Sequence, residues 1–464
     1  METRNRLHKN DETKKLNCIN PDTAGIDIGA KAHLVAIPEG RDEKHVREFP
    51  AFTSSILELV EWLKAMRIKS VAMESTGVYW IPLYELLEDH GFEVLLVNAR
   101  HIKNVPGRKS DVQDCQWIQQ LHSYGLLRGS FRPKELMLTM RTLMRQRATL
   151  IECNSSNILR MQKALSLMNI QIHNVLSDIT GVTGMKIIRD ILRGERDPVK
   201  LAAHRDGRCK NPEDVIRESL VGTYRAEHIF CLRQSVALYD AYLIEIEKCD
   251  IEIQKLLTEM ESRDKPKRRK TLVKEDSSEQ GCSKKAVKKD RLKHKFNFDM
   301  TAELQRIIGL DLTLIPGMNV QTIAVLLSEI GLDMGKWKSS KHFASWLGLC
   351  PRNRISGGKV LSSRTCPNAN KAAAALRKCA NSLYRANCAL GAFFRRMRSR
   401  LGAPKAITAT AHKLAVTLYN MLSKGVEFIE SGVEYYEERY RNRCIKNLKQ
   451  KAKELGFEIS PLPS

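Results

Sequence analysis

Short apolar segments alternate with amphipathic ones throughout residues 24–123, and this alternation constrains the fold more than any other feature of the chain. Period-two segments predict strands, and apolar residues three and four apart predict helices. The predicted order is three strands, helix, strand, helix, strand and helix, at residues 24–28, 32–37, 45–49, 54–66, 70–73, 79–89, 93–97 and 110–123. An initial hairpin followed by strand–helix repeats predicts an α/β domain, a mixed sheet with flanking helices.

Residues 136–262 have a different period. Apolar residues recur every seven positions at Met144, Ile151, Ile158, Leu165, Ile172 and Ile179. A second run, from Ile229 to Met260, alternates steps of three and four, with Asp250 as its single break. Such steps are typical of coiled-coil helices that pair within a chain or across a dimer. The alternative is a long amphipathic helix packed on its own domain.

Composition shifts mark the remaining boundaries. Residues 263–295 hold 14 Lys and Arg against 5 Asp and Glu, with few large apolar side chains, which predicts a disordered basic linker. Residues 296–430 have mainly helical patterns, with a loop expected at 351–369. The predicted domains are an arm at 1–20, the α/β domain at 21–135, long helices at 136–262, the linker at 263–295, a helical domain at 296–430 and a charged tail at 431–464.

The chain is strongly basic, with 77 Lys and Arg against 53 Asp and Glu and a net charge of +24. This excess argues against a neutral metabolic enzyme and favours a polyanion, with nucleic acid ahead of a membrane surface. No apolar run approaches the roughly 18 residues of a membrane span, and the charged N-terminus has no signal-peptide core. The 12 Cys are scattered without a CxxC pair, which predicts reduced thiols and no zinc site in a cytoplasmic protein.

Four carboxylates occupy unusual positions in the α/β pattern. Asp27 lies inside the apolar first strand, and Glu74 directly follows another apolar strand. Asp111 and Asp114 are three residues apart at a predicted helix start, so they share one helix face. A carboxylate in an apolar strand is costly without a compensating cation. The four acids could therefore converge on a pair of Mg²⁺ ions, as in two-metal phosphoryl transfer; each acid alone could equally be a surface or capping residue.

A serine in the second half of the chain stands among phosphate-binding residue types. Ser356 lies between Arg352 and Arg354 on one side and Gly357, Gly358 and Lys359 on the other. Glycines allow close backbone approach and the cations suit a phosphate, although the residues alone favour an ordinary turn serine. Arg377, Arg395 and Arg396, with Arg398 and Arg400, predict a basic face for nucleic acid; the alternative is a solvated helix face.

Several motifs together resemble a known family. These are GIDIG, VAMESTG and RKSDVQD in the α/β region, and LIPGMNVQTIAVLLSEIG and WLGLCPRNRISGGK later in the chain. They resemble the DEDD, RuvC-like transposases of bacterial insertion sequences, in their longer subgroup, whose members act as bridge-RNA-guided recombinases. The resemblance implies an RNase H-like N-terminal fold, coiled-coil helices and a mainly helical C-terminal transposase domain.

The resemblance also implies the chemistry and the partners. Asp27, Glu74, Asp111 and Asp114 match the family's Mg²⁺-binding acids, with two ions expected, and Ser356 matches its nucleophile, with Ser362 and Ser363 as local competitors. A covalent phosphoserine with a free 3′-hydroxyl would then precede strand exchange, at a site assembled between domains or subunits. The implied partners are donor DNA, target DNA, a structured non-coding guide RNA and further copies of the chain, as a dimer or tetramer, in the bacterial cytoplasm at the nucleoid.

Two other functions are compatible with the residues. A metal-dependent junction nuclease would use water as its nucleophile and leave Ser356 with a structural role. A non-catalytic nucleic-acid-binding scaffold would need none of the four acids. An actin-like ATPase also begins with a GIDIG-type strand, but the later sequence lacks its phosphate-binding loops.

Overall fold

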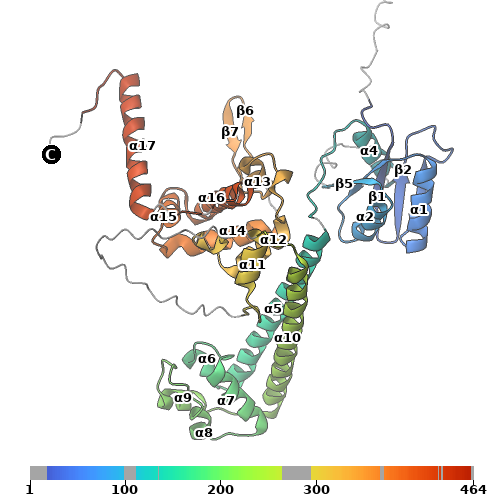
Figure 1. The fold of residues 1–464 in the computed structure, drawn as a ribbon. Coiled ribbons are helices and arrows are strands. Elements are labelled where there is room, and N and C mark those ends of the chain that lie inside the picture. Colours follow the sequence, from blue (N-terminus) through green and yellow to red (C-terminus); the bar gives the residue numbers. More distant parts are fainter. Residues whose placement is uncertain are drawn as a thin grey trace, which may run out of the picture. The chain divides into compact units, whose positions relative to one another are not determined.

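A computed structural model describes residues 18–98, 111–133, 135–263, 294–365, 370–426, 428–429 and 432–460. The chain divides into two compact units, Met1–Arg132 and Pro133–Ser464 (Figure 1). Most of the predicted N-terminal arm and nearly all of the predicted basic linker lie outside the described residues. None of the described helices is both long and apolar enough to cross a bilayer.

The first unit contains a mixed five-stranded sheet, as the alternating pattern predicts. Its spatial order is β3-β2-β1-β4-β5, formed by β1 (Thr23–Ile28), β2 (Ala32–Ala36), β3 (Val46–Pro50), β4 (Ser70–Glu74) and β5 (Glu93–Val97). The first three strands are antiparallel neighbours, whereas β1, β4 and β5 run parallel. The carboxyl ends of β1, β4 and β5 therefore meet at one edge of the sheet.

Helices cover both faces of this sheet. α1 (Thr53–Ala65) and α2 (Trp80–Asp89) bury their apolar faces against Ile26, Val71 and Met73. α4 (Asp111–Ser123) covers the opposite face, where Ile118 packs on Ala72 and Val97. Gly25 lets α4 approach this closely, because an added Cβ would lie 2.3 Å from the Gln119 amide nitrogen.

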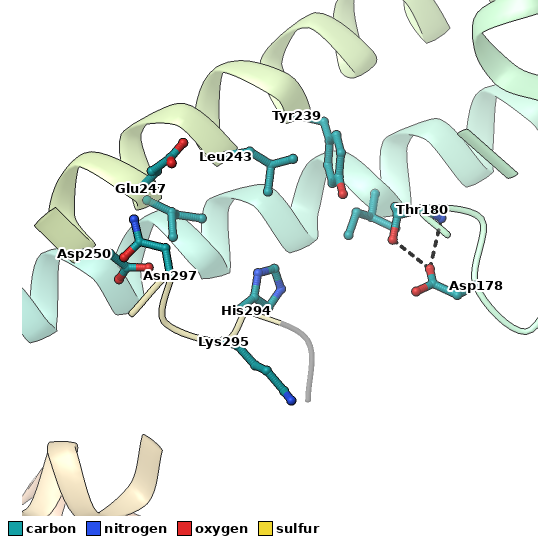
Figure 2. Close-up of a pocket in the computed structure, with 11 residues that line it drawn as sticks. Asp178, Thr180, Tyr239, Leu243, Glu247, Asp250, His294, Lys295 and Asn297 are labelled. Carbon is teal, nitrogen blue, oxygen red and sulfur yellow. Dashed lines mark hydrogen bonds between the residues drawn. The ribbon is translucent and has the colours of Figure 1, made fainter. Parts of the chain in front are cut away.

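Two long helices form the stem of the second unit. α5 (Glu135–Leu167) and α10 (Ala226–Glu259) pack side by side within the chain (Figure 1). The break at Asp250 has a structural explanation: Arg147 donates from Nε to Asp250 Oδ1 at 2.5 Å, and both side chains are almost fully buried. Figure 2 shows Asp250 beside a cavity of about 360 Å³ that is also lined by Glu247 and His294.

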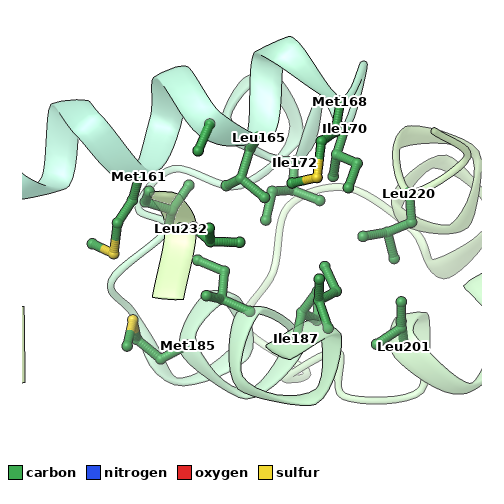
Figure 3. Packing of buried hydrophobic residues seen from close by; sticks show 14 of the residues in the cluster. Met161, Leu165, Met168, Ile170, Ile172, Met185, Ile187, Leu201, Leu220 and Leu232 are labelled. Carbon is green, nitrogen blue, oxygen red and sulfur yellow. The ribbon is translucent and has the colours of Figure 1, made fainter. Parts of the chain in front are cut away.

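The seven-residue repeat predicts a helix that is longer than the observed one. α5 ends at Leu167, so Ile172 and Ile179 belong to a separate cap that is inserted between the long helices. The cap contains α6 (Ile172–Val175), α7 (Val182–Arg193), α8 (Pro198–Ala202) and α9 (Glu213–Ser219). Figure 3 shows its core, in which Ile172 meets residues of α5 and α7. The spacing continues because these isoleucines are buried in this core, not because one helix continues.

The rest of the second unit is mainly helical, as predicted. Its helices are α11 (Met300–Ile308), η1 (Leu312–Leu314), α12 (Val320–Ile330), η2 (Met334–Lys336), α13 (Ser340–Trp346), α14 (Lys371–Ser382), η3 (Leu383–Arg385), α15 (Ala389–Leu401), α16 (Ala403–Lys424) and α17 (Gly432–Glu454). Arg145 joins this region to the stem, because its guanidinium makes two 2.9 Å hydrogen bonds to the carboxylate of Glu329 in α12.

The expected loop at 351–369 is partly wrong. β6 (Arg354–Ser356) and β7 (Lys359–Ser362) form an antiparallel hairpin there. Gly357 and Gly358 connect the strands with φ values of +53° and +73°. Two consecutive positive φ values define the tight turn that matches strand twist, and glycine adopts them without steric cost.

Candidate functional site

Two of the predicted site carboxylates lie next to each other at the parallel edge of the sheet. The register pairs Ile26 of β1 with Met73 of β4, so Asp27 and Glu74 are the next residues on these neighbouring strands. Side chains alternate between sheet faces. Gly25 faces α4, so Asp27, two residues later, shares that face; Ala72 packs on α4, so Glu74 does too.

The first turn of α4 brings a further carboxylate, that of Asp114, to the same face. Burial, followed by the negative charge of Asp27, raises the pKa of the Cys115 thiol to about 12, and the charge of Asp114 adds to the effect. Asp27 and Asp114 therefore act on the same buried thiol from the strand and from the helix. Asp111 is the first residue of α4, one turn before Asp114, and its side chain lies outside the described part of the structure.

Contacts near Glu74 fix the end of its strand. Thr76 donates its hydroxyl to Glu74 Oε1 at 3.0 Å, and the Ser75 amide donates to the carbonyl of Val97 on β5. Asp27, Glu74 and Asp114 are all partly exposed, so solvent and a phosphate could reach them. The predicted metal ligands at this edge are all carboxylate oxygens, the ligand type that Mg²⁺ prefers.

The described side chains do not by themselves form a closed metal site. Among them, no group of three or more His, Cys, Asp and Glu is close enough to hold an ion. Asp111, the fourth predicted ligand, was not part of that set. The residues thus have the chemistry for Mg²⁺, and the presence of the ion remains a prediction.

Ser356 stands on an exposed basic hairpin in the second unit. It is the last residue of β6 and pairs with Lys359 across the turn, so both side chains project from one face of the ribbon. Every residue from Pro351 to Leu361 is exposed. The apolar residues Ile355 and Leu361 are exposed too, at 62% and 70%. The Ser356 side chain is therefore accessible to solvent.

The predicted arginines also have roles in packing. Arg377 donates to the Gly348 carbonyl at 3.4 Å, and Arg395 donates to the Ala386 carbonyl at 2.9 Å. The guanidinium carbon of Arg396 lies 3.4 Å from the ring centroid of Tyr440 in α17. None of the three forms an ion pair within the described residues. They hold helices together and still carry uncompensated charge.

One segment of the sequence lacks acidic residues altogether, a feature that the motifs alone do not reveal. Residues 334–426 include no Asp or Glu, but they hold nine Lys and nine Arg. At the chain's average of 53 acids in 464 residues, a stretch of 93 would carry about eleven. This acid-free segment contains the Ser356 hairpin and helices α13 to α16. A long run with charges of one sign only is typical of proteins that bind nucleic acid.

Two family models match the chain. A transposase model, that of the DEDD transposases of IS110, matches residues 24–170, which include the sheet, α4 and α5. A second model, described as transposase IS116/IS110/IS902 family, matches residues 311–395, which include the Ser356 hairpin and end within α15. None of the curated proteins matches the chain. These two matches, both to models of IS110-type transposases, support a transposase or recombinase function.

Proposed function

We propose that this chain is the transposase of an insertion sequence and that it breaks and rejoins DNA through Ser356 and a Mg²⁺-binding set of carboxylates. The observation that carries the proposal is the placement of Asp27 and Glu74 on adjacent strand ends, facing α4 with its Asp111 and Asp114. Carboxylates on neighbouring strand ends repel one another unless a cation lies between them. They suit divalent cations at a phosphodiester.

The chemistry follows from the groups available. The Ser356 oxygen attacks the phosphorus, the P–O3′ bond breaks, and the phosphate becomes joined to the serine while a 3′-hydroxyl is released. Rejoining reverses these steps with a 3′-hydroxyl from another strand, so no net hydrolysis occurs. Bound Mg²⁺ would supply positive charge to the attacking and leaving oxygens.

The chain's own residues position the reaction. Lys359, paired with Ser356, provides a cation beside the attacked phosphate. The hairpin segment 351–365 contains no His, Asp or Glu, so the serine proton has to pass to a group outside the hairpin or to water. Ser356 and the carboxylates belong to different units of the chain. The proposal therefore requires that both reach the same phosphodiester when DNA is bound.

The family resemblance supports three finer parts of the proposal. The guide would be a structured RNA encoded beside the gene, the partners would be donor and target DNA, and the working form would be a dimer or tetramer of the chain. The long α5 and α10 helices pack on each other within the chain, so self-association would use other surfaces or their exposed sides.

The decisive test is to trap the covalent intermediate. The full-length protein, Mg²⁺ and the transcript of the flanking non-coding DNA are incubated with duplex DNA from the element's ends that carries a bridging sulfur at the 3′ position. The sulfur leaves readily and rejoins poorly, so a protein–DNA adduct accumulates. We expect an adduct with the wild-type chain and with Ser362→Ala as the matched control, and none with Ser356→Ala.

Each alternative function gives a different result. If Ser356→Ala still cuts DNA and no adduct forms, water is the nucleophile and the junction nuclease is correct. If Asp27→Asn leaves every reaction intact, the carboxylates have no catalytic role and a scaffold is correct. Mixing Ser356→Ala with Asp27→Asn protein tests whether subunits share a site, since activity returns only when different copies supply the two groups.

A further inference from the structure

Five cations gather where α15, α16 and α17 meet. They are Arg396 and Arg400 of α15, Lys413 of α16, and Arg439 and Arg443 of α17, here called the tail cation cluster. Burial and then the charges of Arg443 and Arg439 lower the pKa of Lys413, so the α17 arginines face the α16 lysine. Arg396 and Arg400 both act electrostatically on Tyr440, which places them at the same junction.

Aromatic rings hold part of this cluster in place. The Lys413 ammonium lies 3.9 Å from the ring centroid of Phe393 and 5.5 Å from that of Tyr436. The Arg396 guanidinium lies over Tyr440 at 3.4 Å and over Tyr436 at 5.0 Å. Contacts between cations and ring faces fix the charges without neutralising them. The cluster is thus built by packing, and its charge remains.

Within the described residues this charge is not offset by ion pairs, although α17 also carries Glu434, Glu437 and Glu438. None of the five cations has an ion pair there, and the acid-free segment 334–426 supplies three of them. One guanidinium nitrogen, Nη1 of Arg396, is also buried without a hydrogen-bond partner. A buried donor without an acceptor costs free energy, and adjacent like charges repel. A bound anion with several acceptor oxygens would offset the repulsion between the cations.

We propose that the tail cation cluster binds the phosphate backbone of duplex DNA, at a site separate from the Ser356 hairpin. This inference rests on the proposed function, which supplies both duplex DNA and a guide RNA; duplex DNA is favoured because the cluster offers cations for a continuous phosphate backbone, whereas a structured RNA is recognised largely through its unpaired bases. The rings of Phe393, Tyr436 and Tyr440 already contact cations, so their role in the cluster is to hold the charges in place. The site would therefore contact the DNA backbone, and its affinity would not depend on the base sequence. α17 lies beyond both matched family segments, of which the later one ends at residue 395.

The test measures how DNA affinity of the full-length protein depends on salt. The probe is a short duplex of arbitrary sequence, and the readout is fluorescence anisotropy over a range of NaCl concentrations. The variant is Arg439→Ala with Arg443→Ala. The matched control, Arg441→Ala with Lys449→Ala, removes the same charge from exposed α17 residues that do not appear among the groups acting on Lys413.

Each lost phosphate contact lowers the slope of log affinity against log salt by about 0.9. We therefore expect the Arg439/Arg443 variant to lose about 1.8 from the slope and to bind roughly tenfold or more weakly near 0.1 M salt. In the control, the slope should fall by less than half of this amount. Removing two repelling cations should leave the melting temperature at low salt equal or higher.

Three results would overturn the inference. The first is an equal loss of slope in the variant and the control, which would indicate diffuse charge only. The second is unchanged DNA binding together with weaker binding of the flanking transcript, which would assign the cluster to RNA. The third is a lower melting temperature in the variant, which would make the arginines structural. Failure of Ser356→Ala or Asp27→Asn to affect strand exchange concerns the proposed function alone, since this assay involves no chemistry.

Discussion

The buried pair of Arg147 and Asp250 should be the most sensitive point of the stem. Arg147 donates to both carboxylate oxygens, at 2.5 and 3.3 Å, and to the His294 carbonyl at 2.9 Å. Its guanidinium also lies 4.2 Å from the ring centroid of Phe296. Asp250→Ala would leave this guanidinium 4% exposed with only neutral partners.

Removing one partner of a buried ion pair costs about 3–5 kcal/mol, whereas replacing both with apolar residues is often neutral. The cavity beside Asp250 offers room for water to hydrate the uncovered guanidinium, so we expect the lower end, about 3 kcal/mol. The double variant Arg147→Met with Asp250→Leu should recover most of this loss. The single variant isolates the uncompensated charge, and the double variant removes it.

Amide hydrogen exchange followed by mass spectrometry is the suitable assay, since unfolding of a chain with two units need not be two-state. A loss of 3 kcal/mol should speed exchange in the middle of α5 and α10 roughly 100-fold, because each 1.4 kcal/mol is a factor of ten. The first unit should exchange as in the wild type. The reasoning would be refuted if amide exchange in Asp250→Ala were as slow as in the wild type. It would also be refuted if the double variant exchanged as fast as the single variant.

Three further predictions test the sheet and the hairpin. Gly25→Ala should destabilise the first unit by about 2–4 kcal/mol, because its Cβ would meet the α4 backbone at 2.3 Å, whereas Gly207→Ala, in open space, should be silent in thermal unfolding. Alanine at Gly357 or Gly358 should cost about 1–2 kcal/mol of hairpin stability, visible as faster local amide exchange; unchanged exchange would argue against the tight turn. Cys115 should resist alkylation at pH 8 while exposed thiols react, since it is buried and its pKa is about 12; equal labelling would contradict the packing of α4.

The sequence predicted the first unit well for a local reason. Each strand and helix there has its own apolar period, and the observed bounds differ from the expected ones by about one residue. The positions of Asp27 and Glu74 at strand ends follow from the same periods. Their adjacency in space depends on the pairing of β1 with β4, which only the structure establishes.

The second unit was harder because its patterns mix local and distant causes. The seven-residue spacing through Ile172 and Ile179 describes burial in the cap and was wrong as a sign of continuous helix. The hairpin around Ser356 was missed although two glycines between short β-prone segments are a hairpin signal. The acid-free run from 334 to 426 is a property of composition over many residues, so it does not show in any single motif.

The sequence alone determined the order of elements in the first unit, the choice of four acids as candidate ligands and the basic character of the later region. These properties depend on residue type and on periods of two to four positions. The tertiary structure alone decided that Asp250 is satisfied by Arg147, 103 residues away, and that Arg396 packs on Tyr440 of α17. Such pairings join residues far apart along the chain, so no local period encodes them, and only the packed helices bring their charges together.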